Sequence, residues 1–402
     1  MTKTNSIITI NDCHSDASTT VRRLLNQIKH TAESFALIHN LEIVNLNNFL
    51  SGSVCNPQPI LNALMSHSGV DIRTLLNMNS VSKFKDKLTQ IPKVVTMSGD
   101  ESRKTARVFY RGPSKDSKTP FYRYFDTATT PTSPFRPELI QQLMFADGSS
   151  DIHRSYFNHG HFEDQMTLFL GDVNLHWLNN SSEQQIFTAN QFATSYKLPF
   201  IPHTFTSRPE HCGRILAVTY LGSIANQEFV SLSKDLTLNK LCELLDAYEP
   251  NDNLGADYNL GVVTSIAPTT SQIYSGNSQR VQLIDQIPGQ PNSSVSLLCV
   301  SPKSRLIIPP NLNHQWLFNC SNVSAETSWE DGAFDLAPDS SMAVSPMTEL
   351  ILQNPKSDIA TIACFSVRAG DGDPFLHAKR ILKYVGRDAV SRIQHETCQW
   401  FD

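Results

Sequence analysis

The sequence has few charged residues, and the charges it has nearly cancel. There are 33 Lys and Arg against 38 Asp and Glu, so the net charge is −5, and charged residues make up 18% of the chain. Nucleic acids and anionic membranes call for a basic excess in their partners, so this balance argues against both. No apolar run approaches the roughly 18 residues of a membrane helix, and the first residues lack a signal-peptide pattern.

The sequence also lacks a cysteine framework. Its 8 cysteines are scattered and form no Cys-x-x-Cys pair, which argues against a disulfide-stapled secreted domain. Buried free thiols are typical of a reducing compartment, so we expect a cytoplasmic protein. With 402 residues, the chain is long enough for two or three domains of about 150 residues each.

The chain changes texture along its length. Residues 1–90 contain short helical patterns joined by tight turns, which resemble a helix-turn-helix unit. Within it, residues 43–50 carry neither Lys nor Arg, which favours a scaffold role over DNA binding. Short β-rich segments follow over 91–228, then a helical connector over 229–256, and β-rich segments with a final helix over 257–402. We therefore predict an α+β, mainly β protein with two loosely similar β-rich halves.

One β-rich segment combines side chains that suit a metal site. On an extended strand, residues two apart share a face, so His159, His161, Glu163 and Gln165 are expected to point the same way. A further histidine, His203, follows a proline about forty residues later. Two imidazoles and one oxygen donor on one face leave positions open for substrate and O2, as in facial-triad Fe(II) oxygenases.

The residues alone leave the ligand set open. Glu163 or Asp164 can replace Gln165 as the oxygen donor, and a carboxylate is the stronger ligand of the two types. His159 is either a ligand or a support for one. His314, in the second β-rich region, has no companion at metal spacing, so we expect that half to hold no metal.

The pattern His-x-His-x3-Gln, followed by a glycine, resembles the first motif of the cupins, with Gln165 where these small jelly-roll barrels usually have Glu. The Pro-His pair at His203 resembles their second motif. The resemblance implies a cupin barrel with a metal inside and a second, degenerate cupin-like half.

Several separated segments carry a more specific resemblance: residues 25–33, 121–128, 158–161, 202–205 and 314–316. Together they resemble the hydroxyethylphosphonate dioxygenase and methylphosphonate synthase family of non-haem iron enzymes. The resemblance implies that Fe(2+) is bound by His161, Gln165 and His203. The dioxygenase has its iron-binding Glu six residues before the last His, a position that here is Lys197. A protonated lysine cannot bind iron. The synthases have a glutamine ligand four residues after the first His, which is the position of Gln165 here, so the resemblance is closer to the synthase.

The same resemblance implies the substrate and the residues that bind it. Lys29, Arg111, Tyr124 and Asn158 are expected to bind a phosphonate, and His159 to support the metal ligands. The implied reaction is the O2-dependent cleavage of 2-hydroxyethylphosphonate to methylphosphonate and bicarbonate.

Two alternatives to this reaction remain. The first is a dioxygenase that forms hydroxymethylphosphonate and formate. The second is a non-catalytic regulator that joins a helix-turn-helix to a small-molecule-sensing cupin. The sequence leaves open whether Lys29 serves its own chain or a neighbour in a homo-oligomer.

Overall fold

The computed structural model describes part of the chain's first 90 positions and most of the remainder. The described residues are 21, 25, 32–53, 56–68, 92–130, 133, 135–148, 152–208, 212–220, 232–233, 235–248, 262–265, 278–284, 292–368 and 373–394. Contacts divide the chain into two compact units, with the boundary between Gln90 and Ile91. No helix among these residues is long and apolar enough to span a membrane.

The first unit is helical. It contains α2 (Ala32–Ile38), α3 (Ile43–Leu50) and α4 (Gln58–Ser68). Its apolar side chains form a core of their own, which includes Phe35, Leu46, Phe49, Ile60 and Leu64. Lys29 lies outside the described residues. The described part of this unit is therefore helical and has an apolar core of its own.

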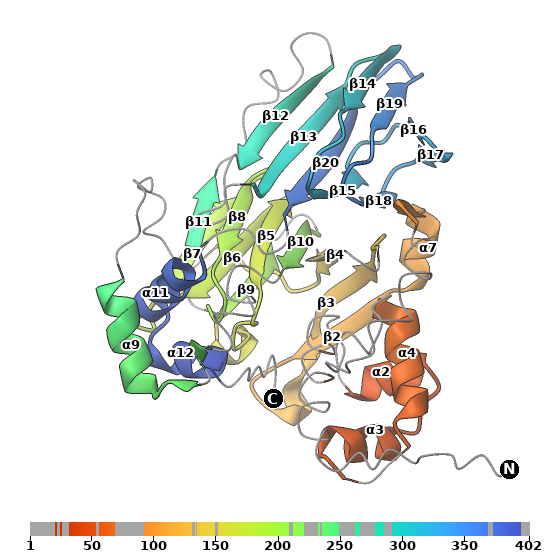
Figure 1. Ribbon diagram of the computed structural model, residues 1–402. Coiled ribbons are helices and arrows are strands. Elements are labelled where there is room, and N and C mark those ends of the chain that lie inside the picture. Colours follow the sequence, from red (N-terminus) through yellow and green to blue (C-terminus); the bar gives the residue numbers. More distant parts are fainter. Residues whose placement is uncertain are drawn as a thin grey trace, which may run out of the picture. The chain divides into compact units, whose positions relative to one another are not determined.

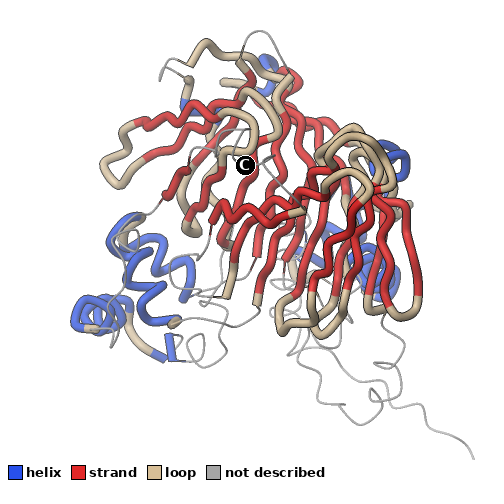
Figure 2. The backbone as a smooth tube through the Cα atoms, turned by 90° about the horizontal axis from the view of Figure 1, so that it is seen from above, coloured by secondary structure: helices blue, strands red, loops and turns tan. Residues whose placement is uncertain are grey.

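The first β-rich half consists of two antiparallel sheets (Figures 1 and 2). The seven-stranded sheet has the order β11-β8-β5-β10-β4-β3-β2, and the three-stranded sheet has the order β7-β6-β9. Apolar side chains from both sheets, such as Phe169 and Phe205, pack between them. The strands are β2 (Arg107–Arg111), β3 (Thr119–Asp126), β4 (Phe135–Gln142), β5 (Asp164–Phe169), β6 (Val173–Leu178), β7 (Gln184–Ala189), β8 (Thr194–Lys197), β9 (His203–Ser207), β10 (Arg214–Tyr220) and β11 (Val262–Ser265). Two short 3-10 turns, η2 (Lys115–Ser117) and η3 (Arg154–Tyr156), lie in its loops.

The second β-rich half repeats this plan. A six-stranded sheet, β1-β18-β15-β20-β13-β12, faces a four-stranded sheet, β14-β19-β16-β17. Its core is apolar and includes Leu298, Leu317 and Ile362. The strands are β1 (Val94–Met97), β12 (Gln279–Ile284), β13 (Ser294–Val300), β14 (Ser304–Ile308), β15 (His314–Asn319), β16 (Ala325–Trp329), β17 (Gly332–Leu336), β18 (Ser341–Val344), β19 (Leu350–Asn354) and β20 (Ala360–Val367). The prediction of a mainly β protein with two similar halves is confirmed.

The two halves exchange strands at their edges. β1 precedes the first half in the chain but pairs with β18 of the second half, Val94 lying opposite Val344. Conversely, β11 lies after the helical connector but pairs with β8 of the first half. The first strand of each predicted range, β1 in 91–228 and β11 in 257–402, therefore belongs to a sheet of the other half. The physical reason is that an edge strand is satisfied by any sheet edge within reach.

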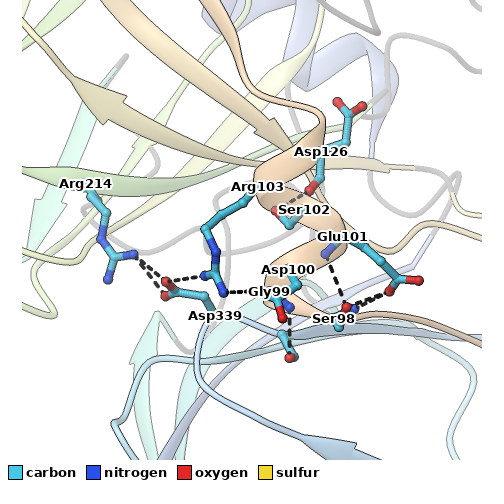
Figure 3. Close-up of polar contacts among 10 residues, drawn as sticks. Ser98, Gly99, Asp100, Glu101, Ser102, Arg103, Asp126, Arg214 and Asp339 are labelled. Carbon is cyan, nitrogen blue, oxygen red and sulfur yellow. Dashed lines mark hydrogen bonds and ion pairs between the residues drawn. The ribbon is translucent and has the colours of Figure 1, made fainter.

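A short helix, α7 (Gly99–Lys104), lies at the junction of the halves (Figure 3). Its N-terminus has a capping box, in which Ser98 Oγ accepts from the Glu101 amide at 3.2 Å and the Glu101 carboxylate accepts from the Ser98 amide at 2.8 Å. Asp339 of the second half accepts from Arg214 of β10 at 2.9 Å and lies 3.8 Å from Arg103. The Asp339 carboxylate thus connects the two β-rich halves.

Three helices gather beside the first half: α9 (Leu238–Ala247), α11 (Pro374–Tyr384) and α12 (Arg387–Gln394) (Figure 1). Thr237 and Asp373 cap the first two of these at their N-termini. α11 meets the seven-stranded sheet through His377, whose Nε2 lies 3.2 Å from the Asp164 carboxylate. The helices thus cover the face of β5 that carries Asp164.

Candidate metal centre

Two buried histidines are held in the same tautomer. The Nδ1 atom of His161 lies 2.7 Å from the carbonyl of Glu163, and that of His203 lies 2.8 Å from the carbonyl of Ile201. A carbonyl can only accept, so each Nδ1 carries the hydrogen and each neutral ring keeps its lone pair on Nε2. The two ring centroids are 5.1 Å apart. This is the arrangement in which a protein prepares imidazoles as metal ligands.

Gln165, on β5, brings an oxygen to the same place. Its Nε2 donates to Thr167 Oγ1 at 2.9 Å, which directs Oε1 toward His161, and Oε1 lies 2.7 Å from His161 Nε2. In this tautomer both atoms present lone pairs to each other, so a shared cation or an added proton is needed to make the contact favourable. The donor set fits a divalent metal, because imidazole nitrogens and a carbonyl oxygen are ordinary ligands for such ions.

Asn158 lies against the other histidine. Its Oδ1 accepts from the backbone amides of Gly160 at 3.0 Å and His203 at 2.9 Å. The orientation of the side-chain amide is therefore fixed, and its Nδ2 lies 3.2 Å from His203 Nε2. Asn158 is buried, with 5% of its surface exposed, and it places a hydrogen-bond donor beside a candidate ligand atom.

The loops that carry these residues pack closely because of one glycine. Gly160 has φ +73°, and a Cβ atom there would lie 2.3 Å from the carbonyl carbon of Phe200. The Phe200 amide donates to the His161 carbonyl at 2.8 Å, and the Asn158 amide donates to the His203 carbonyl at 3.1 Å. A residue without a side chain is required here, both for the backbone angle and for the space.

The prediction that residues 159–165 form one strand is wrong. β5 begins only at Asp164, and the left-handed backbone at Gly160 interrupts the extended geometry. The side chains of residues 159–163 therefore do not alternate between the two faces of a strand. His161 and Gln165 still meet, but His159 is exposed. The carbonyl of His159 accepts from Arg392 at 3.1 Å.

The two carboxylates considered as alternatives to Gln165 are placed differently. Asp164 points to the opposite face of β5, where its Oδ1 accepts from the Tyr196 hydroxyl at 2.5 Å. Glu163 contributes its backbone carbonyl to His161. Across the described part of the chain, no three side chains among His, Cys, Asp and Glu are grouped to hold a metal. The geometry therefore favours Gln165 as the oxygen donor.

The predicted phosphonate-binding residues divide into three cases. Asn158 lies at the centre, whereas Lys29 is outside the described residues. Arg111 is buried and donates to the Tyr156 carbonyl, and burial lowers the pKa of its guanidinium. Tyr124 is buried in the aromatic cluster of β3, with its ring 5.9 Å from that of Tyr122, and burial raises its pKa well above the ordinary value. The structure thus brings Asn158 into direct contact with His203 and buries Arg111 and Tyr124 in the protein interior.

Thr167 and Tyr122 lie beside the centre but do not follow from the sequence motifs, and Lys197 was singled out only by its position in the dioxygenase pattern. Thr167 and Lys197 line the same interior face as Gln165, and Lys197 is fully buried. Tyr122 accepts from the Phe205 amide at 2.7 Å and so supports β9, which begins with His203. Strand alternation predicts the side of Thr167, but only the pairing of β5 with β8 reveals that Lys197 is its neighbour.

Comparisons with known proteins find a curated relative in sequence and solved structures of similar fold. No protein-family model matches the chain. The methylphosphonate synthase of Nitrosopumilus maritimus (strain SCM1) is 31% identical over 218 residues, which are 53% of this chain and 45% of that protein. The chain therefore matches less than half the length of this curated relative.

Solved structures show the same fold at lower identity. Streptomyces albus hydroxyethylphosphonate dioxygenase, with 2-hydroxyethylphosphonate and Fe(II) bound, gives a TM-score of 0.52 at 18% identity, covering 96% of this chain and 99% of that chain. PhpD with cadmium gives a TM-score of 0.51 at 14% identity, covering 88% and 93%. The predicted fold, a cupin with a second cupin-like half, is confirmed.

Proposed function

Because the chain is a relative of methylphosphonate synthase in sequence and of hydroxyethylphosphonate dioxygenase in fold, we propose that it is a non-haem iron dioxygenase that acts on a phosphonate. The observation that carries this proposal is the convergence of His161 Nε2 with Gln165 Oε1 at 2.7 Å, beside a second histidine held in the same tautomer. We propose one Fe(2+) per chain, bound by His161, Gln165 and His203. When bound, this ion supplies the activation of O2.

The substrate that suits this centre is 2-hydroxyethylphosphonate. Its phosphonate and its hydroxyl, two carbons away, make a natural chelate for a divalent metal. The protein contributes donors around it: the Asn158 amide faces the ligand side of His203 at 3.2 Å, where it can donate to a bound oxygen. We assign Arg111 and Tyr124, with Lys29, to the phosphonate end, since a dianion requires cationic and neutral donors.

The products that we propose are methylphosphonate and bicarbonate, with O2 as the oxidant. The reaction balances without another reductant, because the substrate loses all the electrons that O2 gains when the carbon–carbon bond is cleaved. Two residues support this product. Gln165 supplies a neutral amide, and Lys197 occupies the position at which the dioxygenase has its iron-binding Glu. We also assign the protein to a reducing compartment, the cytoplasm, since Cys242, Cys299 and Cys364 are buried free thiols.

The experiment that tests the function is a 31P NMR assay of the full chain. The protein is loaded with Fe(II) without oxygen, mixed with 2-hydroxyethylphosphonate and exposed to air. A phosphorus signal coupled to a methyl group supports the synthase reaction, and a hydroxymethyl signal assigns the dioxygenase reaction instead. If the protein consumes no substrate and binds duplex DNA in a salt-sensitive way, the enzyme hypothesis is wrong and the regulator hypothesis is favoured.

The assay needs a matched pair of variants. His203→Ala removes a proposed ligand and is expected to abolish turnover. His153→Ala removes an exposed histidine whose ring is bonded to the Ser155 hydroxyl, and it is expected to keep full activity. Equal activity in both variants would contradict the proposed centre.

A further inference from the structure

Four polar side chains form a square on the interior face of the seven-stranded sheet. Gln165 and Thr167 come from β5, and Lys197 and Ser195 come from β8. The register sets Gln165 opposite Lys197 and Thr167 opposite Ser195. Because residues two apart share a face and directly paired residues lie side by side, all four point the same way.

The square faces the three-stranded sheet and is closed to water. Lys197 has none of its surface exposed, and its Nζ lies 4.9 Å from the centre of the Phe205 ring of β9. The same strand begins with His203, whose ring centroid is 5.7 Å from that of Phe205. The amino group of Lys197 therefore lies within the same interior as the candidate metal ligands.

Lys197 and Gln165 share one acceptor. Thr167 Oγ1 accepts from Gln165 Nε2 at 2.9 Å and from Lys197 Nζ at 3.2 Å, and Lys197 also donates to Ser195 Oγ at 3.4 Å. A hydroxyl oxygen has two lone pairs, and an ammonium group is only a donor. Both lone pairs of the Thr167 hydroxyl are then engaged. Thr167 accepts from the amide nitrogen of Gln165, so this nitrogen faces Thr167 and Oε1 faces His161.

We propose that Lys197 is a positioning residue that holds the Gln165 amide through Thr167 and makes this centre specific for a neutral oxygen ligand. This inference rests on the proposed metal centre. A carboxylate at position 165 has no hydrogen to give to Thr167. It is attracted instead to the buried ammonium, because two opposite charges interact strongly where water is excluded. Lys197 thus draws a carboxylate away from the metal but leaves an amide in place.

The test measures Co(II) binding to the full chain by calorimetry and by the visible absorption of the bound ion, with no turnover required. Lys197→Met and Thr167→Val are each expected to weaken binding about tenfold, as is usual when a group that orients a ligand is removed. The double variant is expected to be no weaker than either single one, because both act on the same amide. Lys197→Arg and Thr167→Ser are expected to retain most of the affinity.

Exchange of the oxygen ligand gives the sharper readout. With Lys197 present, Gln165→Glu is expected to bind Co(II) more weakly than the wild type. In the Lys197→Met background, Gln165→Glu is expected to bind more tightly than Lys197→Met alone. A merely structural role for the lysine does not reverse the order of Gln and Glu. Lys240→Met, an exposed lysine of α9 with 65% of its side chain accessible, is the matched control.

The outcomes separate this inference from the proposed function. If the wild type binds no Co(II), the metal centre itself is refuted. If the wild type binds but Lys197→Met and Thr167→Val bind equally well, the positioning role is refuted. If Gln165→Glu binds more tightly while Lys197 is present, the specificity for a neutral ligand is refuted. Should Lys197→Met fail to fold, Thr167→Val and Gln165→Glu in the wild-type background still decide the matter.

Discussion

The two β-rich halves share an architecture but not an interior. Each has two facing antiparallel sheets, and each receives its edge strand from the other part of the chain. In the first half, His161 and His203 each donate Nδ1–H to a backbone carbonyl. In the second half, His314 opens β15, and its buried Nδ1 has no hydrogen-bond partner within the described part of the chain. The interior of that half is filled by apolar side chains.

This difference teaches that the barrel alone does not make a metal centre. The fold supplies the framework, and the chemistry comes from the loops and the strand ends that fix each ligand atom. A histidine becomes a dependable donor when its second nitrogen is held, as in His161 and His203. The same residue type in the apolar half lacks that support.

The largest expected effect is the loss of metal when one held histidine is removed. His161→Ala or His203→Ala is expected to abolish Fe(II) or Co(II) binding, because two remaining neutral donors cannot compete with water. His314→Ala is the control from the other half and is expected to retain a stoichiometry near one. Metal analysis after gel filtration checks both. Binding by His203→Ala, or loss in His314→Ala, would reverse the assignment of the halves.

The next effect concerns the loop that sets the first half apart. Gly160→Ala is expected to destabilise the protein by about 3 kcal/mol, because a Cβ meets the Phe200 backbone at 2.3 Å at a positive φ. Gly148→Ala is a matched control, since Gly148 has φ +93° but no atom nearer than 3.8 Å. Chemical denaturation of both variants measures the difference. Equal stability would show that close packing at Gly160 is not required.

A smaller effect is expected at the donor beside the ligands. Asn158→Ala removes an amide that is placed to meet an anionic ligand, at a cost of about 1.5–3 kcal/mol in substrate affinity. Metal affinity is expected to change less, because Asn158 is not itself a ligand. Calorimetry with 2-hydroxyethylphosphonate and Co(II)-loaded protein measures this, with the exposed Asn180→Ala as control. Unchanged affinity for the phosphonate would remove Asn158 from the binding site.

The smallest effect is a pH dependence of stability in the first half. Burial lowers the pKa of His176, on β6, from 6.5 to about 4. The unfolded chain therefore binds this proton first, so the contribution of neutral His176 is present above pH 6.5 and is lost as the pH falls toward 4. By about pH 5.5 we expect a loss on the order of 1–2 kcal/mol, which His176→Gln removes from the pH profile of unfolding. An unchanged profile in that variant would assign the dependence to other groups.

Much of the local structure could be predicted from the sequence. The helix over residues 238–247 follows from its apolar spacing and the Thr237 cap, and β13, β15 and β20 follow from continuous apolar runs. β4 and β16 to β18 were harder to predict. Pro137 lies within β4, and the strands after Cys320 mix polar residues with few β-branched ones. Tertiary pairing, rather than intrinsic preference, stabilises them.

The chemistry of the candidate centre was determined by the sequence to a large degree. The spacing of His161, with His203 after its proline, was sufficient to propose one metal, because side-chain type and local period are properties of the chain itself. The choice of Gln165 as the third ligand came from the family resemblance. Only the tertiary structure decided that β1 and β11 join the other half's sheets, that His159 is exposed, and that Lys197 lies opposite Gln165. Such facts depend on pairing between distant strands and on the backbone angle of Gly160, which local periodicity does not encode.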